Sequence, residues 1–162
     1  METITSSSTM DRANRRITWL VTFFFMFVLY LTRDIHGVEW ILYAVFCTLY
    51  VVIYGNLPTQ FILTREEVIL DAPFAKRRIA LNEIVEIRPV EAAEKRGIIR
   101  TLGSSGIFGD WGYYYSPTFR TAKVYARRRD HWILIVTSRQ GKYIIAPDDP
   151  SFIHYLNRAL LK

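Results

Sequence analysis

Cysteine and histidine, which supply most protein metal sites, are scarce in this chain. Cys47 is its only cysteine and stands inside an apolar run, which excludes an intrachain disulfide and any multi-cysteine metal site. The histidines His36, His131 and His154 are far apart, and no C-x-x-C, H-x-x-x-H or H-E-x-x-H spacing occurs. The sequence therefore predicts neither a metal nor a cofactor.

Motifs of catalysis and of phosphate binding are absent as well. The segment GSSGIFG at residues 103–109 does not match the G-x-S-x-G of a hydrolase, and no Lys-Ser/Thr pair of a phosphate-binding loop follows it. No two acidic residues have a spacing that indicates acid–base catalysis. We predict that the protein is not an enzyme. The glycine-rich segment is expected to fold its apolar side chains onto the domain or toward lipid, with an anion-binding backbone nest as the alternative.

Charge is missing from two long stretches near the N-terminus. Residues 17–32 (ITWLVTFFFMFVLYLT) and 40–55 (WILYAVFCTLYVVIYG) contain no charged side chain. Neither stretch has a polar stripe at a period of 3.6 residues, so neither resembles the amphipathic helix of a soluble protein. A helix that is apolar all round lies in a large core or in a bilayer, and this chain is too short for such a core. The pattern predicts a transmembrane hairpin over residues 17–56.

The first stretch is short for a spanning helix, because 16 residues cover about 24 Å. Arginines at both of its ends can extend to the headgroups and make up the difference. Aromatic residues that favour headgroup depth lie near the ends of both stretches: Trp19, Tyr30, Trp40 and Tyr54. Two alternatives remain, a soluble hairpin covered by a partner and a hairpin that enters only one leaflet.

Basic residues near the helix ends predict the orientation of the hairpin. They flank its outer ends at Arg12, Arg15 and Arg16 and again from Arg65 onward, whereas the connecting turn offers Arg33 against Asp34 and Glu39. By the positive-inside rule, the protein crosses the cell membrane twice with both termini in the cytoplasm. The small polar residues at the start predict a disordered cytoplasmic segment over residues 1–16.

From residue 57 to the end, the pattern changes to short alternating runs separated by turns. Residues 61–64, 68–72, 74–81, 84–90, 113–115, 119–126, 131–137 and 142–146 are compatible with strands. Residues 91–103 are expected to form a helical turn or a loop. Residues 151–161 follow a Pro-Asp-Asp-Pro step and have apolar residues at helical spacing. We predict a mainly β domain over residues 57–162, a small barrel of about seven strands closed by a C-terminal helix.

Four segments of this domain resemble the bacterial pleckstrin-homology-like (bacterial PH) domain: FILTREEVILDAP, NEIVEIRPV, GSSGIFGDWGYYYS and KYIIAPDDPSFIHYL. The most specific is the last, a strand followed by a small-Pro-x-x-Pro step and an amphipathic helix. The resemblance covers about residues 60–158 and implies a membrane-anchored PH-like barrel, usually without an assigned catalytic activity. Two spanning helices ahead of the domain are also common in that family.

Positive charge is concentrated in the predicted β domain. Residues 1–55 hold four basic and four acidic residues, whereas residues 56–162 hold 17 basic against 11 acidic, which gives the whole net charge of +6. Such a domain is attracted to an anionic leaflet. The candidate lipid, anion or partner surface consists of three clusters: Lys76 and Arg78; Lys95, Arg96 and Arg100; and Arg127, Arg128 and Arg129. Solvated strand edges that prevent aggregation are the alternative role of each cluster.

We therefore predict a non-catalytic interaction module that is anchored by its hairpin in membrane lipid. Its expected partner is an unidentified protein or a second copy of the chain, and a sensor of anionic lipid headgroups is the alternative. Because the triple arginine is expected to lie on the surface, its replacement by glutamate should leave the fold intact. Tyrosines 113–115 with Arg120 and Lys123 could stack nucleic-acid bases, but membrane tethering disfavours this, and no nucleic acid is predicted.

Overall fold

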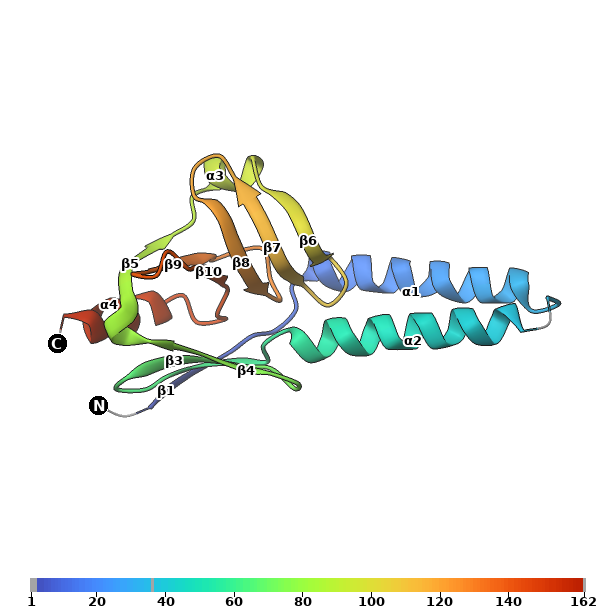
Figure 1. Ribbon diagram of the computed structural model, residues 1–162, viewed down its shortest axis with the longest axis horizontal. Helices are drawn as coiled ribbons and strands as arrows, with labels where there is room; N and C mark the ends of the chain where they lie inside the picture. Colours follow the sequence, from blue (N-terminus) through green and yellow to red (C-terminus); the bar gives the residue numbers. More distant parts are fainter. Residues whose placement is uncertain (1–2, 36, 162) are drawn as a thin grey trace.

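The computed structural model describes residues 3–35 and 37–161, in which a helical hairpin projects from a mainly β region (Figure 1). Helices α1 (Arg12–Thr32) and α2 (Val38–Asn56) run side by side away from the β region and are joined at their far ends. The C-terminal helix α4 (Phe152–Leu160) lies at the opposite end of the molecule.

Helix α1 is longer than the uncharged stretch that predicted it. Asp11 caps its N-terminus by accepting the backbone N–H of Asn14 at 2.7 Å, so the helix includes Arg12, Arg15 and Arg16. Its 21 residues and the 19 residues of α2 correspond to lengths of about 31 and 28 Å. By length and composition, both helices can cross a membrane.

The helices contact each other through aromatic rings and leave most of their apolar side chains exposed. Phe25 of α1 stacks on Phe46 of α2 with ring centroids 4.0 Å apart, and Thr22 Oγ1 lies 2.6 Å from the Tyr50 hydroxyl. Large apolar side chains on the outside include Leu20, Phe23, Phe24, Phe27, Leu31, Trp40, Ile41 and Val51. An exposed apolar surface of this extent is unusual for a protein surrounded by water.

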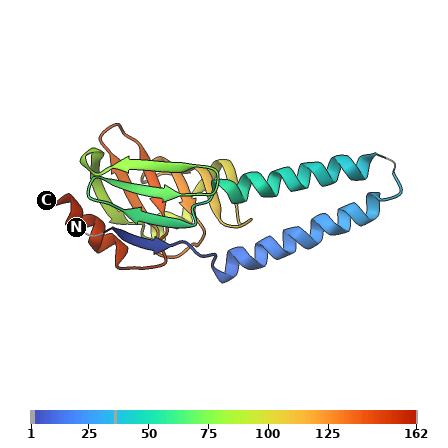
Figure 2. The same cartoon turned by 90° about the horizontal axis from the view of Figure 1, so that it is seen from below.

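Strands and short helices alternate through the rest of the chain. The first four strands, β1 (Ile4–Ser7), β2 (Gln60–Leu63), β3 (Glu67–Asp71) and β4 (Lys76–Ala80), form an antiparallel sheet in that order, which Figure 2 shows from below. The second sheet has the order β5-β9-β10-β8-β7-β6, in which only β10 and β8 are parallel. Its strands are β5 (Ile84–Pro89), β6 (Ile99–Ser105), β7 (Asp110–Ser116), β8 (Arg120–Ala126), β9 (Ile133–Thr137) and β10 (Lys142–Ile145). The 3₁₀ turn η1 (Leu81–Glu83) connects the sheets, and α3 (Ala92–Arg96) precedes β6.

The mainly β region followed by a C-terminal helix is confirmed, but the closed barrel of about seven strands is not. Ten strands occur in the described residues, and no pairing joins the two sheets into a barrel. Strand β4, at the edge of the first sheet, and β6, at the edge of the second, are not paired, and Arg77, Leu102 and Trp111 line a pocket of about 230 Å³ between the sheets.

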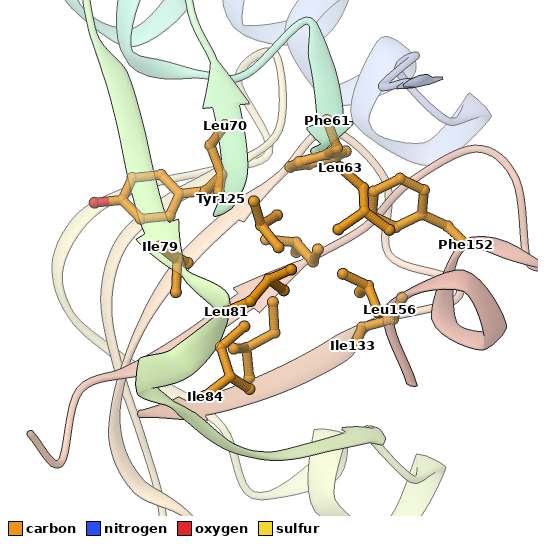
Figure 3. Packing of buried hydrophobic residues seen from close by; sticks show 13 residues of the cluster. Phe61, Leu63, Leu70, Ile79, Leu81, Ile84, Tyr125, Ile133, Phe152 and Leu156 are labelled. Carbon is orange, nitrogen blue, oxygen red and sulfur yellow. The ribbon is translucent and has the colours of Figure 1, made fainter. Parts of the chain in front are cut away.

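The main hydrophobic core lies between the sheets and is covered by α4 (Figure 3). Phe61, Leu63 and Leu70 of the four-stranded sheet face Ile133 of the second sheet, and α4 adds Phe152 and Leu156. Alternate residues on the same strands point to the other side of the second sheet, where Val124, Leu134 and Ile144 form a second cluster with Trp132. Both faces of the second sheet are therefore apolar, which explains the continuous apolar run of β9.

The prediction of a disordered segment over residues 1–16 is wrong for most of its length. Residues 4–7 form β1 and pair with β2, and α1 begins at Arg12, while residues 1 and 2 lie outside the described part. The polar strand is held by the Pro-Asp-Asp-Pro loop, because Asp148 accepts the N–H of Thr9 at 3.0 Å and donates its own N–H to the Ser7 carbonyl at 2.9 Å. Backbone pairing and these contacts order a segment that has too few apolar side chains to order itself.

Candidate functional site

The turn between β6 and β7 inserts between the ends of the two long helices that lie next to the β region (Figures 1 and 2). Thr18 Oγ1 of α1 accepts the N–H of Phe108 at 2.9 Å and lies 3.3 Å from the Gly106 carbonyl oxygen. The Phe108 ring makes edge-on contacts with Tyr50 and Tyr54 of α2, with centroids 5.3 and 5.5 Å apart. The turn thus binds both helices at once, and we call this contact the wedge.

Close approach in the wedge depends on glycine. A Cβ atom on Gly106 would lie 2.8 Å from Ile17 Cγ2 of α1, and the residue has φ +92°, a conformation that other residues rarely adopt. The sequence predicted that this segment folds its apolar side chains onto the β domain or toward lipid, whereas Phe108 packs against the ends of α1 and α2. Trp111 lies outside the wedge, in the groove described next.

Beside the wedge, an open apolar groove of about 900 Å³ runs between α2 and the free edge of β6. Ala44, Leu49 and Val52 form its wall on α2, and Leu102 and Trp111 form the wall on the sheet. Leu102, Gly103 and Trp111 also line the pocket of about 230 Å³ between the sheets. The two spaces therefore adjoin each other at these residues, and we refer to them together as the groove.

Three basic residues line the two spaces that make up the groove. Arg100 lines its apolar part, and Arg77 and Lys123 line the pocket between the sheets. Arg77 donates to Asn56 Oδ1 at 3.0 Å and stacks over Tyr125, whereas Lys123 lies over the rings of Tyr113 and Tyr143. None of these three residues, the rim cations, has an acidic partner among the described residues. Burial raises the pKa of the Tyr125 phenol, and Arg77 and Lys123 oppose that shift.

Of the rim cations, the sequence singled out Arg100 for the candidate surface, whereas Arg77 and Lys123 were missed. Lys76 and Arg78 were chosen in place of Arg77 because alternate strand residues share a face. That geometry is correct, but Arg77 shares its face with buried Ile79 and therefore points toward the groove. An inward-facing charge in a strand was the signal that could have found it.

The other predicted basic residues of β4 form ion pairs on the outer face of the sheet. Lys76 Nζ lies 3.2 Å from Asp71 Oδ1, and Arg78 Nη1 lies 3.3 Å from Glu67 Oε1. A hydrogen bond from Gln60 and the charge of Lys76 lower the pKa of the Asp71 carboxyl. These pairs neutralise the two cations locally, and the structure does not bring them to the groove.

The triple arginine lies at a corner of the β region that contacts the start of α1. The prediction that these arginines lie on the surface is wrong for Arg127. This side chain is 8% exposed, donates to the Leu57 carbonyl at 3.3 Å and lies over the Tyr54 ring. Burial lowers the pKa of the Arg127 guanidinium. Its carbonyl oxygen accepts from Asn14 Nδ2 at 3.1 Å. The residue follows the end of β8, and the docking of α1 and Tyr54 against it accounts for its burial.

Arg128 and Arg129 are engaged by carboxylates. Arg128 pairs with Asp130 and, at 2.9 Å, with Asp148. The hydrogen bond from Arg128 lowers the pKa of the Asp130 carboxyl. Arg129 Nε lies 3.6 Å from Oδ2 of Asp110, a carboxylate that is only 2% exposed. The backbone N–H of Arg129 also donates to the Asp11 carboxylate at 2.9 Å. The triplet thus carries no uncompensated charge cluster.

The remaining predicted cations, Lys95 and Arg96 of α3, have different surroundings. Lys95 donates to the Arg129 carbonyl at 3.0 Å and lies over Trp132, and burial lowers the pKa of its amine. Arg96 is exposed and has no hydrogen-bond or ion-pair partner in the part of the chain that the structure describes. It does not line the groove.

The four aromatic residues predicted at the membrane interface separate into two groups. Trp19, Tyr30 and Trp40 are exposed on the hairpin, and Arg33 stacks on Tyr30 with the guanidinium carbon 4.6 Å from the ring centroid. Tyr54 is also exposed, but it contacts both Phe108 and Arg127. It is part of the contact between α2 and the β region.

Metal-binding groups do not gather at the groove or elsewhere in residues 3–35 and 37–161. No three His, Cys, Asp or Glu side chains come together there in an arrangement that could hold a metal ion. His131 is near Asp130 at 3.9 Å, whereas His36 lies outside the described residues. Within these ranges the arrangement offers an apolar channel with a cationic end.

Comparison with protein families finds a match to the model described as Bacterial PH domain over residues 59–159. The matched part extends from β2 to α4 and includes the sheet side of the groove. No curated protein and no solved structure matches the chain.

Proposed function

Because the chain belongs to the bacterial PH domain family, we propose that it is a non-catalytic interaction module fixed to the cell membrane by α1 and α2. In this proposal the helices cross the membrane twice and the β region lies in the cytoplasm. The β region presents its surface to a partner protein or to a second copy of the chain. The family match and the two long apolar helices support the anchoring part of the proposal.

The wedge is the observation that carries the proposal. A domain joined to its anchor by a flexible linker would sample many orientations, whereas here α2 ends at Asn56 and β2 starts at Gln60. Phe108 is held by Thr18 of one helix and by two tyrosines of the other. A module held in this way offers the same face to every partner that moves in the plane of the membrane.

The proposed depth in the membrane follows from the helix lengths. A hydrocarbon layer of about 30 Å needs about 20 helical residues, which takes α1 from Thr32 back to its first turn. Thr18 is six residues from the start of α1, or about 9 Å along the axis. In this placement the tip of the wedge lies inside the inner-leaflet end of the hydrocarbon layer. The exposed arginines 12, 15 and 16 lie on the cytoplasmic side of it.

Single-cysteine labelling tests the topology. In a Cys47→Ala background, Asp34→Cys marks the turn between the helices, and Arg139→Cys marks the turn between β9 and β10. A membrane-impermeant maleimide added to spheroplasts is expected to label the first variant and to label the second only after lysis. Both variants should remain in the membrane pellet after alkaline carbonate washing.

The two variants control for each other, because both sites are exposed in the structure and both should react fully in detergent. Labelling of Arg139→Cys in intact spheroplasts would contradict the proposed orientation. Release of the protein by carbonate would contradict membrane anchoring. Chemical cross-linking followed by purification in a mild detergent then shows whether the partner is a different protein or a second copy.

A further inference from the structure

We propose that the groove binds one anionic phospholipid, with an acyl chain along α2 and the phosphate at the rim cations Arg77, Arg100 and Lys123. This inference rests on the proposed membrane anchoring. It goes further by assigning a site and a ligand class to a surface that otherwise presents only general positive charge.

The apolar part of the groove has the composition and position of a chain-binding channel. Its walls are the aliphatic side chains of Ala44, Val45, Leu49 and Val52 on α2 and of Leu102 on β6. Its volume of about 900 Å³ is within the range of small-molecule sites. Leu102 and Leu49 are exposed side chains, so a hydrocarbon chain between them would pack against apolar surface on both walls.

The floor of the groove is kept open by a pair of glycines. Gly103 and Gly112 face each other across β6 and β7, and both have φ near +123°. A Cβ atom on Gly103 would lie 2.0 Å from the Trp111 carbonyl oxygen. The strands can approach each other this closely only because neither residue has a side chain, and Gly103 lines both the apolar space and the pocket between the sheets.

Charge complementarity selects an anionic headgroup. The rim cations come from three different strands, and none has an acidic partner among the described residues. Lys76, Arg78 and Arg128, in contrast, are paired with carboxylates. Three cations that line these two adjoining spaces and have no acidic partner are a suitable site for a phosphate.

The direction of the groove agrees with the orientation of an inner-leaflet lipid. Its apolar walls follow α2 from Ala44 toward Ile53, and Arg77 binds Asn56 at the cytoplasmic end of that helix. A lipid whose chain lies along α2 would therefore have its phosphate where the cations are. A transmembrane helix of a partner would satisfy the apolar wall but would leave the cationic end without an anion.

Native mass spectrometry of the full chain tests the proposal. The protein is reconstituted into nanodiscs with equal amounts of phosphatidylglycerol and phosphatidylethanolamine of identical chains, and the lipids retained on release are identified. We expect one retained phosphatidylglycerol per chain. Arg100→Glu should lower this retention about tenfold. Arg96→Glu makes the same change of charge at an exposed position outside the groove and should leave retention unchanged.

A second pair of variants tests the chain-binding part. Ala44→Phe fills the groove and should lower retention, whereas Cys47→Phe adds the same ring at an exposed position of α2 that does not line the groove. Soluble glycerol phosphate in excess should not displace the lipid, because it lacks the chain. The midpoint of thermal unfolding of each variant in detergent confirms that the protein is folded.

Several outcomes would overturn the proposal: equal loss in Arg100→Glu and Arg96→Glu, equal retention of both lipids, displacement by glycerol phosphate, or a dimer that carries no lipid. Entry into nanodiscs is recorded separately. Failure to enter would refute the membrane anchoring and the lipid site together, whereas entry without selective retention would refute the lipid site alone.

Discussion

At the scale of single residues, the triple arginine shows how far the environments of identical neighbours can differ. Arg127 is buried under Tyr54, Arg128 lies between two carboxylates, and Arg129 faces buried Asp110. Composition places all three on a basic surface. The three side chains have different surroundings because the capped end of α1 packs against the corner between β8 and β9. The same net charge thus has different consequences at each position.

The buried position of Arg127 predicts a large effect of charge reversal. Arg127→Glu would place a carboxylate against the Leu57 carbonyl, where the guanidinium now donates. A buried charge without a partner costs about 3–5 kcal/mol, which lowers the melting temperature of a domain of this size by more than about 10 °C.

Arg96→Glu is the control, because that side chain is exposed and unpaired. Thermal unfolding in detergent measures both, and equal melting temperatures would refute the structural role of Arg127. The expectation that the fold tolerates glutamate at all three arginines is revised accordingly.

At the scale of secondary-structure elements, alternation of apolar residues decided what the sequence could predict. Strands β2, β3 and β9 have clear patterns and were predicted within one or two residues, as was α4. Strand β6 was expected to be a helical turn or a loop, because its first five residues are all exposed and show no alternation. Strand β1 has a single large apolar residue, Ile4, and is ordered by pairing with β2. Because residues of β6 line the groove, the position of the groove could not be predicted from the sequence. Arg100 was selected only as a member of a basic cluster.

The contact between the wedge and α1 predicts a local effect of a threonine substitution. Thr18→Val keeps the shape of the side chain but removes the oxygen that accepts the Phe108 N–H. A hydrogen bond of this kind contributes about 1 kcal/mol, so exchange of this amide for deuterium should be about fivefold faster. Thr32→Val is the matched control, because Thr32 Oγ1 donates to the Val28 carbonyl near the far end of α1 and does not contact the wedge. Unchanged protection of residues 105–110 in Thr18→Val would show that the contact does not hold the turn.

At the scale of the whole molecule, the β domain contains residues from both sides of the hairpin and not only those that follow it. The sequence predicted a self-contained domain over residues 57–162. In the structure, β1 completes the four-stranded sheet, Ser6 and Thr9 bind the loop before α4, and Asp11 binds the corner at Arg129. The residues on either side of the hairpin thus form one folded unit. Both ends of the hairpin are fixed to it.

This continuity predicts that a fragment of residues 57–162 is less stable than the same fragment with residues 3–11 joined ahead of it by a flexible Gly/Ser linker. Without β1, the edge of β2 is free and Asp148 loses its bonds to Ser7 and Thr9. The loss of these bonds, each worth about 1 kcal/mol, should lower the melting temperature by more than about 10 °C. A fragment in which residues 3–11 are scrambled controls for the linker and the added length. If the scrambled and native segments stabilise the fragment equally, β1 makes no specific contribution, and the domain ends where the sequence alone placed its boundary.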